Sequence, residues 1–219
     1  MRIAEFIPVI RSPEKPLEGV TYVENGEGRE TLAQKIGCLR ELADADYYVF
    51  HHQDLKIETP ELIGPSCERM RVDGVGVAGV IGTRYMSKAC GWWMHQRGVV
   101  TAGAIMQGDG KGGAYCMADE PGYHADLVAV DGCILIISRE MLELYEVHDF
   151  GHYRFGYDSD ICFQVLRAGM KVATVDVRCR HESQGHFNQA EWAGFQKKFI
   201  GYWEQYVDFP VISQSTFKE

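Results

Sequence analysis

The chain has no long hydrophobic run and no excess of basic residues. A membrane-spanning helix needs about 18 consecutive apolar residues. No apolar stretch in the 219 residues approaches this length, so we expect no membrane span. Lys and Arg number 22 against 31 Asp and Glu, which gives a formal charge of −9. A broad nucleic-acid surface needs clustered basic side chains, so this balance argues against a nucleic-acid partner.

Paired cysteines are also absent. The seven cysteines are scattered without a Cys-x-x-Cys motif, and most lie in apolar runs. This pattern predicts buried free thiols in a reducing compartment, and it excludes a zinc finger or a disulfide framework. The segment Met1–Phe6 lacks the apolar core of a signal peptide. We therefore expect a cytoplasmic protein.

The chain does have the composition and patterning of a globular α/β protein. Hydrophobic residues make up 46% and charged residues 24% of the sequence, which is ordinary for one domain with a substantial core. Apolar runs typical of strands alternate with segments of helical period. Strands are predicted at 3–10, 20–23, 47–50, 75–81, 127–137 and 172–177, and helices at 31–42, 59–71, 138–145, 158–168 and 188–206. The alternation predicts an open, mostly parallel sheet flanked by helices, with ligands at the carboxyl ends of the strands.

One segment shows no period. Residues 82–126 are rich in Gly, Trp and Tyr, and we expect loop there, with at most short strands near Val99–Val100 and Tyr115. Within it, the glycine-rich tract Gly108–Gly113 lacks the spacing of a phosphate-binding P-loop and is predicted to be a mobile loop or lid.

Polar residues follow the strand at 47–50. His52 and Asp54 are two residues apart, so in an extended segment both side chains point to the same side. Carboxylate oxygen suits Mn²⁺ or Mg²⁺, and imidazole suits Mn²⁺ better than Mg²⁺. The alternative is a polar strand end that is simply solvated. His181, which closes a later strand, is either a further ligand or a satisfied structural histidine.

Acids stand at two further positions. Asp158 and Asp160 begin a helix, where either one could cap it or act as a catalytic base. Asp131 and Gly132 interrupt an apolar run, so Asp131 either binds backbone amides in a turn or faces a cleft. Trp92 and Trp93 follow Gly91 and either stack on a sugar ring or anchor a loop.

The order of short motifs resembles that of the family 2-like glycosyltransferases of GT-A fold, over roughly residues 20–190. The closest likeness is to a bacterial subgroup with a His-Gln-Asp signature in place of Asp-x-Asp. The motifs are His52-Gln53-Asp54, Gly79–Gly82, Gly91-Trp92-Trp93, Val130–Cys133, Tyr157–Ile161, Ala168–Val172 and His181.

The resemblance implies a nucleotide-diphospho-sugar transferase of hexosyltransferase type. In such an enzyme Mn²⁺ or Mg²⁺, held by His52, Asp54 and His181, binds the diphosphate of a UDP- or GDP-linked donor. Asp158 activates the hydroxyl of a glycan or other acceptor, and transfer inverts the anomeric centre. The resemblance places the donor and acceptor contacts at Asp131, Gly132, Trp92, Trp93 and Asp160.

The chain departs from the family pattern in two places. Tyr157 stands where the family has Glu, and residues 1–24 give a shortened N-terminal nucleotide-binding part of what we expect to be a single domain over 1–219. Both departures favour an alternative function, a non-catalytic protein that binds nucleotides or sugar nucleotides. A metal-dependent phosphate-ester hydrolase is a third hypothesis.

Overall fold

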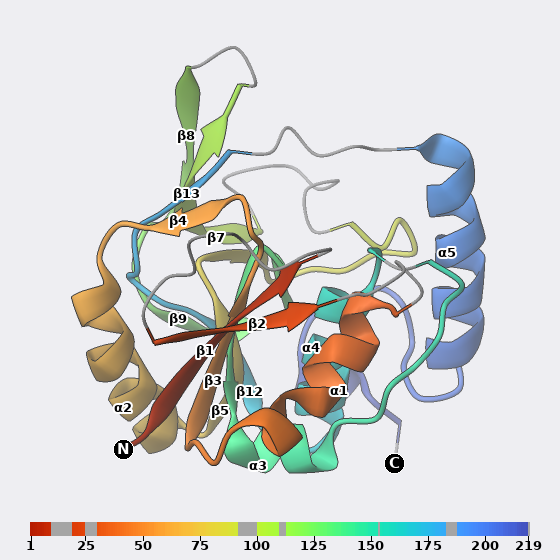
Figure 1. Cartoon of the computed structure of the whole chain (residues 1–219). Coiled ribbons are helices and arrows are strands. Elements are labelled where there is room, and N and C mark those ends of the chain that lie inside the picture. Colours follow the sequence, from red (N-terminus) through yellow and green to blue (C-terminus); the bar gives the residue numbers. More distant parts are fainter. Residues whose placement is uncertain are drawn as a thin grey trace.

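A computed structural model gives the fold, and it describes residues 1–9, 19–24, 30–91, 100–109, 113–152, 154–182 and 188–218. Its main sheet has seven strands (Figure 1). Their spatial order is β2 (Val20–Glu24), β1 (Ile3–Val9), β3 (Tyr47–His51), β11 (Ile134–Ser138), β5 (Val75–Gly79), β12 (Lys171–Thr174) and β9 (His124–Leu127).

A second sheet lies across one end of the first. Its order is β10 (Ala129–Val130), β6 (Ile81–Thr83), β7 (Thr101–Gly108), β13 (Cys179–His181) and β4 (Leu55–Ile57). Strand β8 (Ala114–Asp119) pairs with β7 to form a hairpin that projects from the body of the molecule (Figure 1). Strands β4 and β6 begin within a few residues of the ends of β3 and β5, so the second sheet lies at the end where β3 and β5 finish.

Helices cover both faces of the main sheet. Figure 1 shows α1 (Leu32–Leu42), α3 (Arg139–Leu144) and α4 (Tyr157–Arg167) on one side and α2 (Ile63–Asp73) on the other. The last helix, α5 (Gln189–Trp203), lies outside α4, and two short 3-10 turns complete the described elements, Pro60–Leu62 and Gln214–Thr216. The predicted α/β class, with helices flanking a central sheet, is confirmed.

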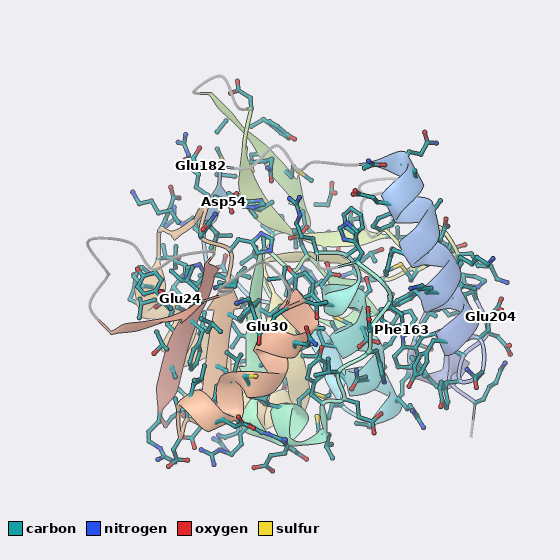
Figure 2. The ribbon with its side chains drawn as sticks, turned by 45° about the vertical axis from the view of Figure 1, so that its right-hand side comes forward. Glu24, Glu30, Asp54, Phe163, Glu182 and Glu204 are labelled. Atoms are coloured by element: carbon teal, nitrogen blue, oxygen red, sulfur yellow. The ribbon has the colours of Figure 1, made fainter. Side chains whose placement is uncertain are left out.

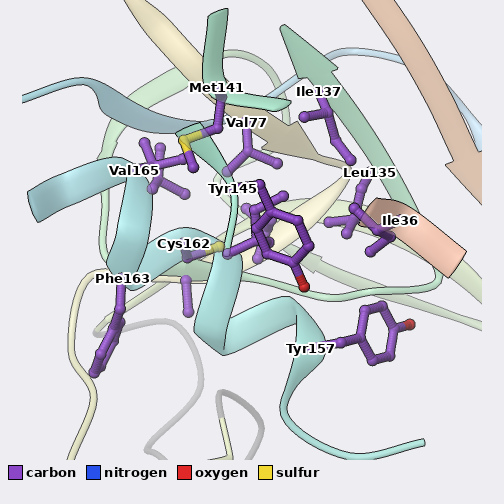
Figure 3. Packing of buried hydrophobic residues seen from close by; sticks show 14 of the residues in the cluster. Ile36, Val77, Leu135, Ile137, Met141, Tyr145, Tyr157, Cys162, Phe163 and Val165 are labelled. Atoms are coloured by element: carbon purple, nitrogen blue, oxygen red, sulfur yellow. The ribbon is translucent and has the colours of Figure 1, made fainter. Parts of the chain in front are cut away.

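Successive side chains of a strand point to opposite faces of the sheet, and in β3 the side chains on both faces are buried. Tyr48 and Phe50 of β3 belong to the apolar cluster that includes α1, α3, α4 and α5. Figure 3 shows part of this cluster, with Ile36 of α1, Met141 of α3 and Val165 of α4. Tyr47 and Val49 point the other way, into a cluster that includes α2 and the second sheet. Successive side chains therefore hold two separate layers against the same strand.

Local sequence signals fix the helix starts. Thr31 begins α1 with a capping box, because its hydroxyl accepts from the Gln34 amide while the Gln34 side chain accepts from the Thr31 amide. Gly156 precedes α4 with φ +83°, and a Cβ there would come within 2.1 Å of the Phe195 ring. Only glycine meets both conditions, so Gly156 sets where α4 starts.

The expectation of a mostly parallel sheet is wrong in detail, because the sheet is mixed. Of six pairings in the main sheet, β1–β2, β1–β3 and β5–β12 are parallel, and β3–β11, β5–β11 and β9–β12 are antiparallel. Only the turn 131–133 separates β10 from β11. A connection that made β11 parallel to β3 and β5 would need a crossover of about a dozen residues. The chain therefore re-enters the sheet at the end where β3 and β5 finish, and runs back between them.

The expectation of an irregular segment at 82–126 is also wrong. Strands β7 and β8 form a long hairpin there, with Tyr115 inside β8, and β9 follows. The first three residues of β7 are all buried, so the segment shows no alternation of apolar and polar residues. Periodicity fails to detect a strand that is covered on both faces.

No helix within the described residues is long and apolar enough to cross a membrane. The seven cysteines are free thiols, and all but Cys38 and Cys116 are buried.

Candidate functional site

The candidate site begins at the turn that follows β3. The His52 amide donates to the Cys133 carbonyl at 2.9 Å, which continues the pairing with β11. The chain then turns, and the Leu55 amide donates to the His52 carbonyl at 3.2 Å. The segment is therefore not extended, as the sequence interpretation assumed, and His52 and Asp54 meet across a turn. His51 points elsewhere and is buried, with its Nε2 atom 3.0 Å from Glu5 Oε1.

Strand register brings His181 to this turn. Antiparallel pairing of β13 with β4 sets His181 opposite Leu55, directly beside residues 52–54. The Glu182 amide then donates to the Asp54 carbonyl at 2.9 Å. In Figure 2 Asp54 and Glu182 lie together near the base of the β7–β8 hairpin. Residues far apart in sequence thus converge because two short strands pair in one register.

Two imidazoles and one carboxylate form the resulting cluster. His52 Nδ1 lies 3.4 Å from His181 Nε2, and His181 Nε2 lies 3.3 Å from Asp54 Oδ1. One ligand atom from each of the three residues lies within 4.8 Å of the others. All three side chains are half-buried, so the cluster is shielded but open to a ligand.

The nitrogens that face away from the cluster are also engaged. His52 Nε2 lies 2.8 Å from the Tyr157 hydroxyl, and His181 Nδ1 lies 3.3 Å from Gln107 Oε1. Gln107 is opposite His181 in the parallel pairing of β7 with β13. Each ring is thus held from behind, as ligand imidazoles in metal sites commonly are.

Charge and burial shape the cluster in opposite ways. The hydrogen bond with His181 lowers the pKa of Asp54. Burial alone would lower the pKa of His181, but the contact with Asp54 and the charge of Asp131 outweigh it and raise that pKa. At His52, burial has the largest effect and lowers the pKa, although the charges of Asp131 and Asp54 act in the opposite direction. The cluster therefore favours a neutral His52 beside an ionised Asp54.

The cluster fits a divalent metal ion. Two ligand atoms about 2.0–2.2 Å from one ion lie about 3.0–3.6 Å apart, and the 3.4 and 3.3 Å contacts lie in that range. Imidazole nitrogen with carboxylate oxygen suits Mn²⁺, and a set of carboxylates and waters would suit Mg²⁺ better.

Asp158 lies in the first turn of α4, next to Tyr157, whose hydroxyl contacts His52. Its Oδ2 atom accepts from the Gly132 amide at 3.2 Å, and its Oδ1 atom accepts from the Ser159 amide at 2.7 Å. Burial, helped by the negative charge of Asp131, raises the pKa of Asp158 to about 7. A carboxyl group with this pKa can exchange a proton near neutrality.

Asp131 and Gly132 form the turn between β10 and β11. Asp131 Oδ1 accepts from the Cys133 amide at 2.7 Å, the first of its two predicted roles. Gly132 leaves room for Tyr157, because a Cβ there would lie 2.2 Å from the Tyr157 hydroxyl oxygen. The Tyr157 hydroxyl in turn donates to the Gly132 carbonyl at 2.8 Å.

Asp160 lies elsewhere, which argues against its predicted contact with donor or acceptor. It is fully buried and accepts from Trp203 Nε1 at 3.0 Å and Gln164 Nε2 at 2.8 Å. His148 Nδ1 also lies 3.0 Å from it. Asp158 and Asp160 are two residues apart, which separates them by about 200° around α4, so the two acids face opposite sides.

Two further predictions concern residues that are not described. Trp92 and Trp93 lie outside the described residues, as do residues 110–112 of the glycine-rich tract. The sequence interpretation missed two residues of the site, Gln107 and Tyr157. Gln107 was hidden in the unrecognised strand β7, and Tyr157 was noticed only as the loss of an acid.

Comparison with known proteins bears on the family and the fold of the chain. The sequence profile of the glycosyltransferase-like family matches residues 5–203. No curated protein sequence matches the chain significantly.

Solved structures with the same fold include two transferase complexes. GalNAc-T7 with UDP, GalNAc and Mn²⁺ superposes with a TM-score of 0.53 at 14% identity over 86% of this chain and 38% of that one. The mannosyltransferase PcManGT from Pyrobaculum calidifontis, in complex with GDP-Man and Mn²⁺, gives 0.50 at 12% identity over 93% of this chain and 63% of that one. This chain thus covers less than two thirds of either protein.

At these identities the superpositions establish a shared fold, and the profile match covers most of the chain. The chain therefore belongs to the glycosyltransferase-like family and has the GT-A fold.

Proposed function

We propose that the protein is a metal-dependent glycosyltransferase that moves a hexose from a nucleotide-diphosphate donor to a hydroxyl group of an acceptor such as a glycan. The observation that carries the proposal is the convergence of His52, Asp54 and His181 at the carboxyl end of β3. In open α/β sheets, ligands bind beyond the carboxyl ends of the strands, at the edge where this cluster lies.

A divalent ion held by His52, Asp54 and His181 would neutralise the diphosphate as it leaves. The two structural neighbours are complexes with Mn²⁺ and UDP or GDP-Man, which supports Mn²⁺ and a UDP- or GDP-linked donor. The two imidazoles of the cluster favour Mn²⁺ over Mg²⁺.

Asp158 is the proposed base. Its carboxylate would take the proton of the acceptor hydroxyl as that oxygen forms a bond to the anomeric carbon, while the bond from that carbon to the phosphate oxygen breaks. A single displacement of this kind inverts the anomeric centre. Asp158 is half-buried and has a pKa of about 7, which supports the role because a base works best when its pKa is near the working pH.

Asp131, Gly132 and the two tryptophans remain proposed contacts of the donor or acceptor. Asp131 raises the pKa of Asp158 by its charge, so it influences the base as well. For Asp160 we propose a structural role instead, because it is fully buried and accepts from the core side chains of Gln164 and Trp203.

One observation favours a second function, a non-catalytic protein that binds sugar nucleotides. Tyr157 is neutral and buried, so α4 begins with only one acid near the cluster, Asp158. Such a protein would bind nucleoside diphosphates but would neither transfer nor hydrolyse the sugar.

The test is release of UDP or GDP from a panel of sugar nucleotides with Mn²⁺ and glycan acceptors. Release that depends on both metal and acceptor supports the transferase, and analysis of the product linkage reports inversion. Donor binding without any release would favour the binding protein. Hydrolysis of a simple aryl phosphate without a sugar nucleotide would contradict both and indicate a phosphate-ester hydrolase.

A further inference from the structure

The Tyr157 hydroxyl lies between two groups and cannot donate a hydrogen bond to both of them. It lies 2.8 Å from the Gly132 carbonyl oxygen and 2.8 Å from His52 Nε2. A carbonyl oxygen only accepts hydrogen bonds, and a phenol has one proton to donate. Both contacts are satisfied only when Tyr157 donates to Gly132 and accepts from His52.

This assignment fixes the protonation of His52. If Nε2 carries the proton that Tyr157 accepts, then Nδ1 of the neutral ring has the free lone pair. Nδ1 is the atom that faces His181 Nε2 at 3.4 Å and belongs to the cluster. The lone pair is therefore directed at the place where a metal ion would be held.

We infer that Tyr157 is a positioning residue that selects the Nε2–H tautomer of His52 and so prepares Nδ1 as a metal ligand. The inference rests on the proposed function, because it assigns a role at the proposed metal site. It also assigns a role to Tyr157, which stands where the family pattern has an acid.

The surroundings of Tyr157 hold the hydroxyl in place. The ring is buried and packs edge to face against Phe50, with 6.5 Å between the ring centroids. Gly132 has no Cβ, and one would collide with the hydroxyl at 2.2 Å. Tyr157 thus reaches His52 only because a glycine occupies the facing turn.

Tyr157→Phe removes the hydroxyl and keeps the ring, so it isolates the inference. We expect Mn²⁺ affinity, measured by calorimetry and by electron paramagnetic resonance of free Mn²⁺, to fall about 10- to 100-fold, as for loss of an outer partner of a metal ligand. Tyr145→Phe is a matched control, because the Tyr145 hydroxyl is buried in the same apolar cluster without a hydrogen-bond partner (Figure 3). It should bind Mn²⁺ like the wild type.

A double-mutant comparison separates positioning from general support of the fold. In a His52→Ala background, Tyr157→Phe should cause no further loss of Mn²⁺ affinity, because the residue acts through His52. An equal loss in both backgrounds would overturn the inference.

A direct reading of the tautomer needs no variant of Tyr157. Nitrogen-15 NMR of the metal-free wild type should show His52 with its proton on Nε2, and a proton on Nδ1 would overturn the inference. The failures are distinguishable. Absence of Mn²⁺ binding by the wild type would refute the proposed metal site along with this role, whereas tight binding by both the wild type and Tyr157→Phe would refute the role of Tyr157 alone.

Discussion

At the scale of single residues, Asp54 is the only carboxylate in the proposed metal cluster. We predict that Asp54→Ala abolishes the Mn²⁺-dependent part of UDP or GDP binding. Removal of a residue that only supports a metal ligand costs about 10- to 100-fold in metal affinity. Because Asp54 is itself a proposed ligand, the loss of Mn²⁺-dependent affinity should be at least as large. Calorimetry with and without Mn²⁺ measures it. Asp176→Ala, which changes an exposed acid, is the control, and normal binding by Asp54→Ala would show that the site is misassigned.

Asp158 is predicted to act in the chemical step and not in binding. Asp158→Asn should lower turnover about 10²- to 10⁴-fold, the usual contribution of a general base. Affinity for the donor should stay unchanged, because the proposed diphosphate site does not include this side chain. Steady-state rates with calorimetry on the same preparation test both parts. A variant that turns over normally would remove Asp158 from the mechanism.

The raised pKa of Asp158 also predicts a pH dependence. Below a pH of about 7 the group is a neutral acid and cannot accept a proton, whereas above it the carboxylate is present. We expect kcat/KM to fall about tenfold per pH unit on the acidic side and to level off above. A nearby dication favours the ionised carboxylate of Asp158. With Mn²⁺ bound, the acidic limb of the kcat/KM profile should therefore lie at or below a pH of about 7.

Asp131→Asn provides the check on this pH dependence. It removes the negative charge that helps to raise the pKa of Asp158, so the acidic limb should move to lower pH. A limb that stays in place would mean that another group controls the rate.

At the scale of elements, buried Asp160 joins α4 to α5. It accepts from Trp203 of α5 and Gln164 of α4 and contacts His148 in the segment before α4. Asp160→Ala leaves these groups without their partner, and we predict a loss of about 3 kcal/mol in unfolding free energy. Denaturant titration measures it. Asp176→Ala should change stability by less than about 0.5 kcal/mol, and a similarly small effect of Asp160→Ala would contradict the role.

Elements with a strong local pattern could be predicted from the sequence. The helix predicted at 31–42 and the strand predicted at 47–50 occur as α1 and β3, because the helical spacing of apolar residues and a short apolar run are visible in the sequence itself. Strand β7 could not be predicted, because its first residues are buried on both faces and it depends on pairing with distant strands. The direction of β11 depends likewise on where the chain re-enters the sheet.

The candidate site was predictable only in part, for the same reason. The turn after β3 and the start of α4 carry visible acids and histidines, so His52, Asp54 and Asp158 are evident as candidates. His181 is also visible as a candidate at the end of its strand, but its contact with Asp54 arises from the register of β13 with β4. The contacts of Tyr157 and Gln107 with these imidazoles follow from tertiary packing, which no local pattern encodes.

At the scale of the whole molecule, the cluster ties together segments that are far apart in sequence. Its ligands come from the turn after β3 and from β13, so an ion bound there stabilises the folded state as a whole. At 100 times its Kd, Mn²⁺ should add about 2.7 kcal/mol, a Tm rise of about 5–10 °C for a chain of this size. Calorimetric melts with Mn²⁺ and with EDTA measure it. Asp54→Ala should show no rise, and an equal rise in this variant would place the ion elsewhere.

The N-terminal strands bear on donor binding. Strands β1, β2 and β3 are parallel neighbours, so their carboxyl ends lie at one edge of the sheet. That edge is where a donor nucleotide is proposed to bind, next to the metal cluster. Binding of the donor at this edge is therefore the first claim to test.

The most direct test is therefore calorimetric titration of UDP and of GDP into the wild-type protein, each with and without Mn²⁺. The account predicts that at least one of them binds tightly with Mn²⁺ and at least tenfold more weakly without it, as about 10- to 100-fold effects at metal sites imply. Equal affinity with and without Mn²⁺ would contradict the metal-dependent donor site and favour the nucleotide-binding alternative. Absence of binding under both conditions would contradict the transferase itself.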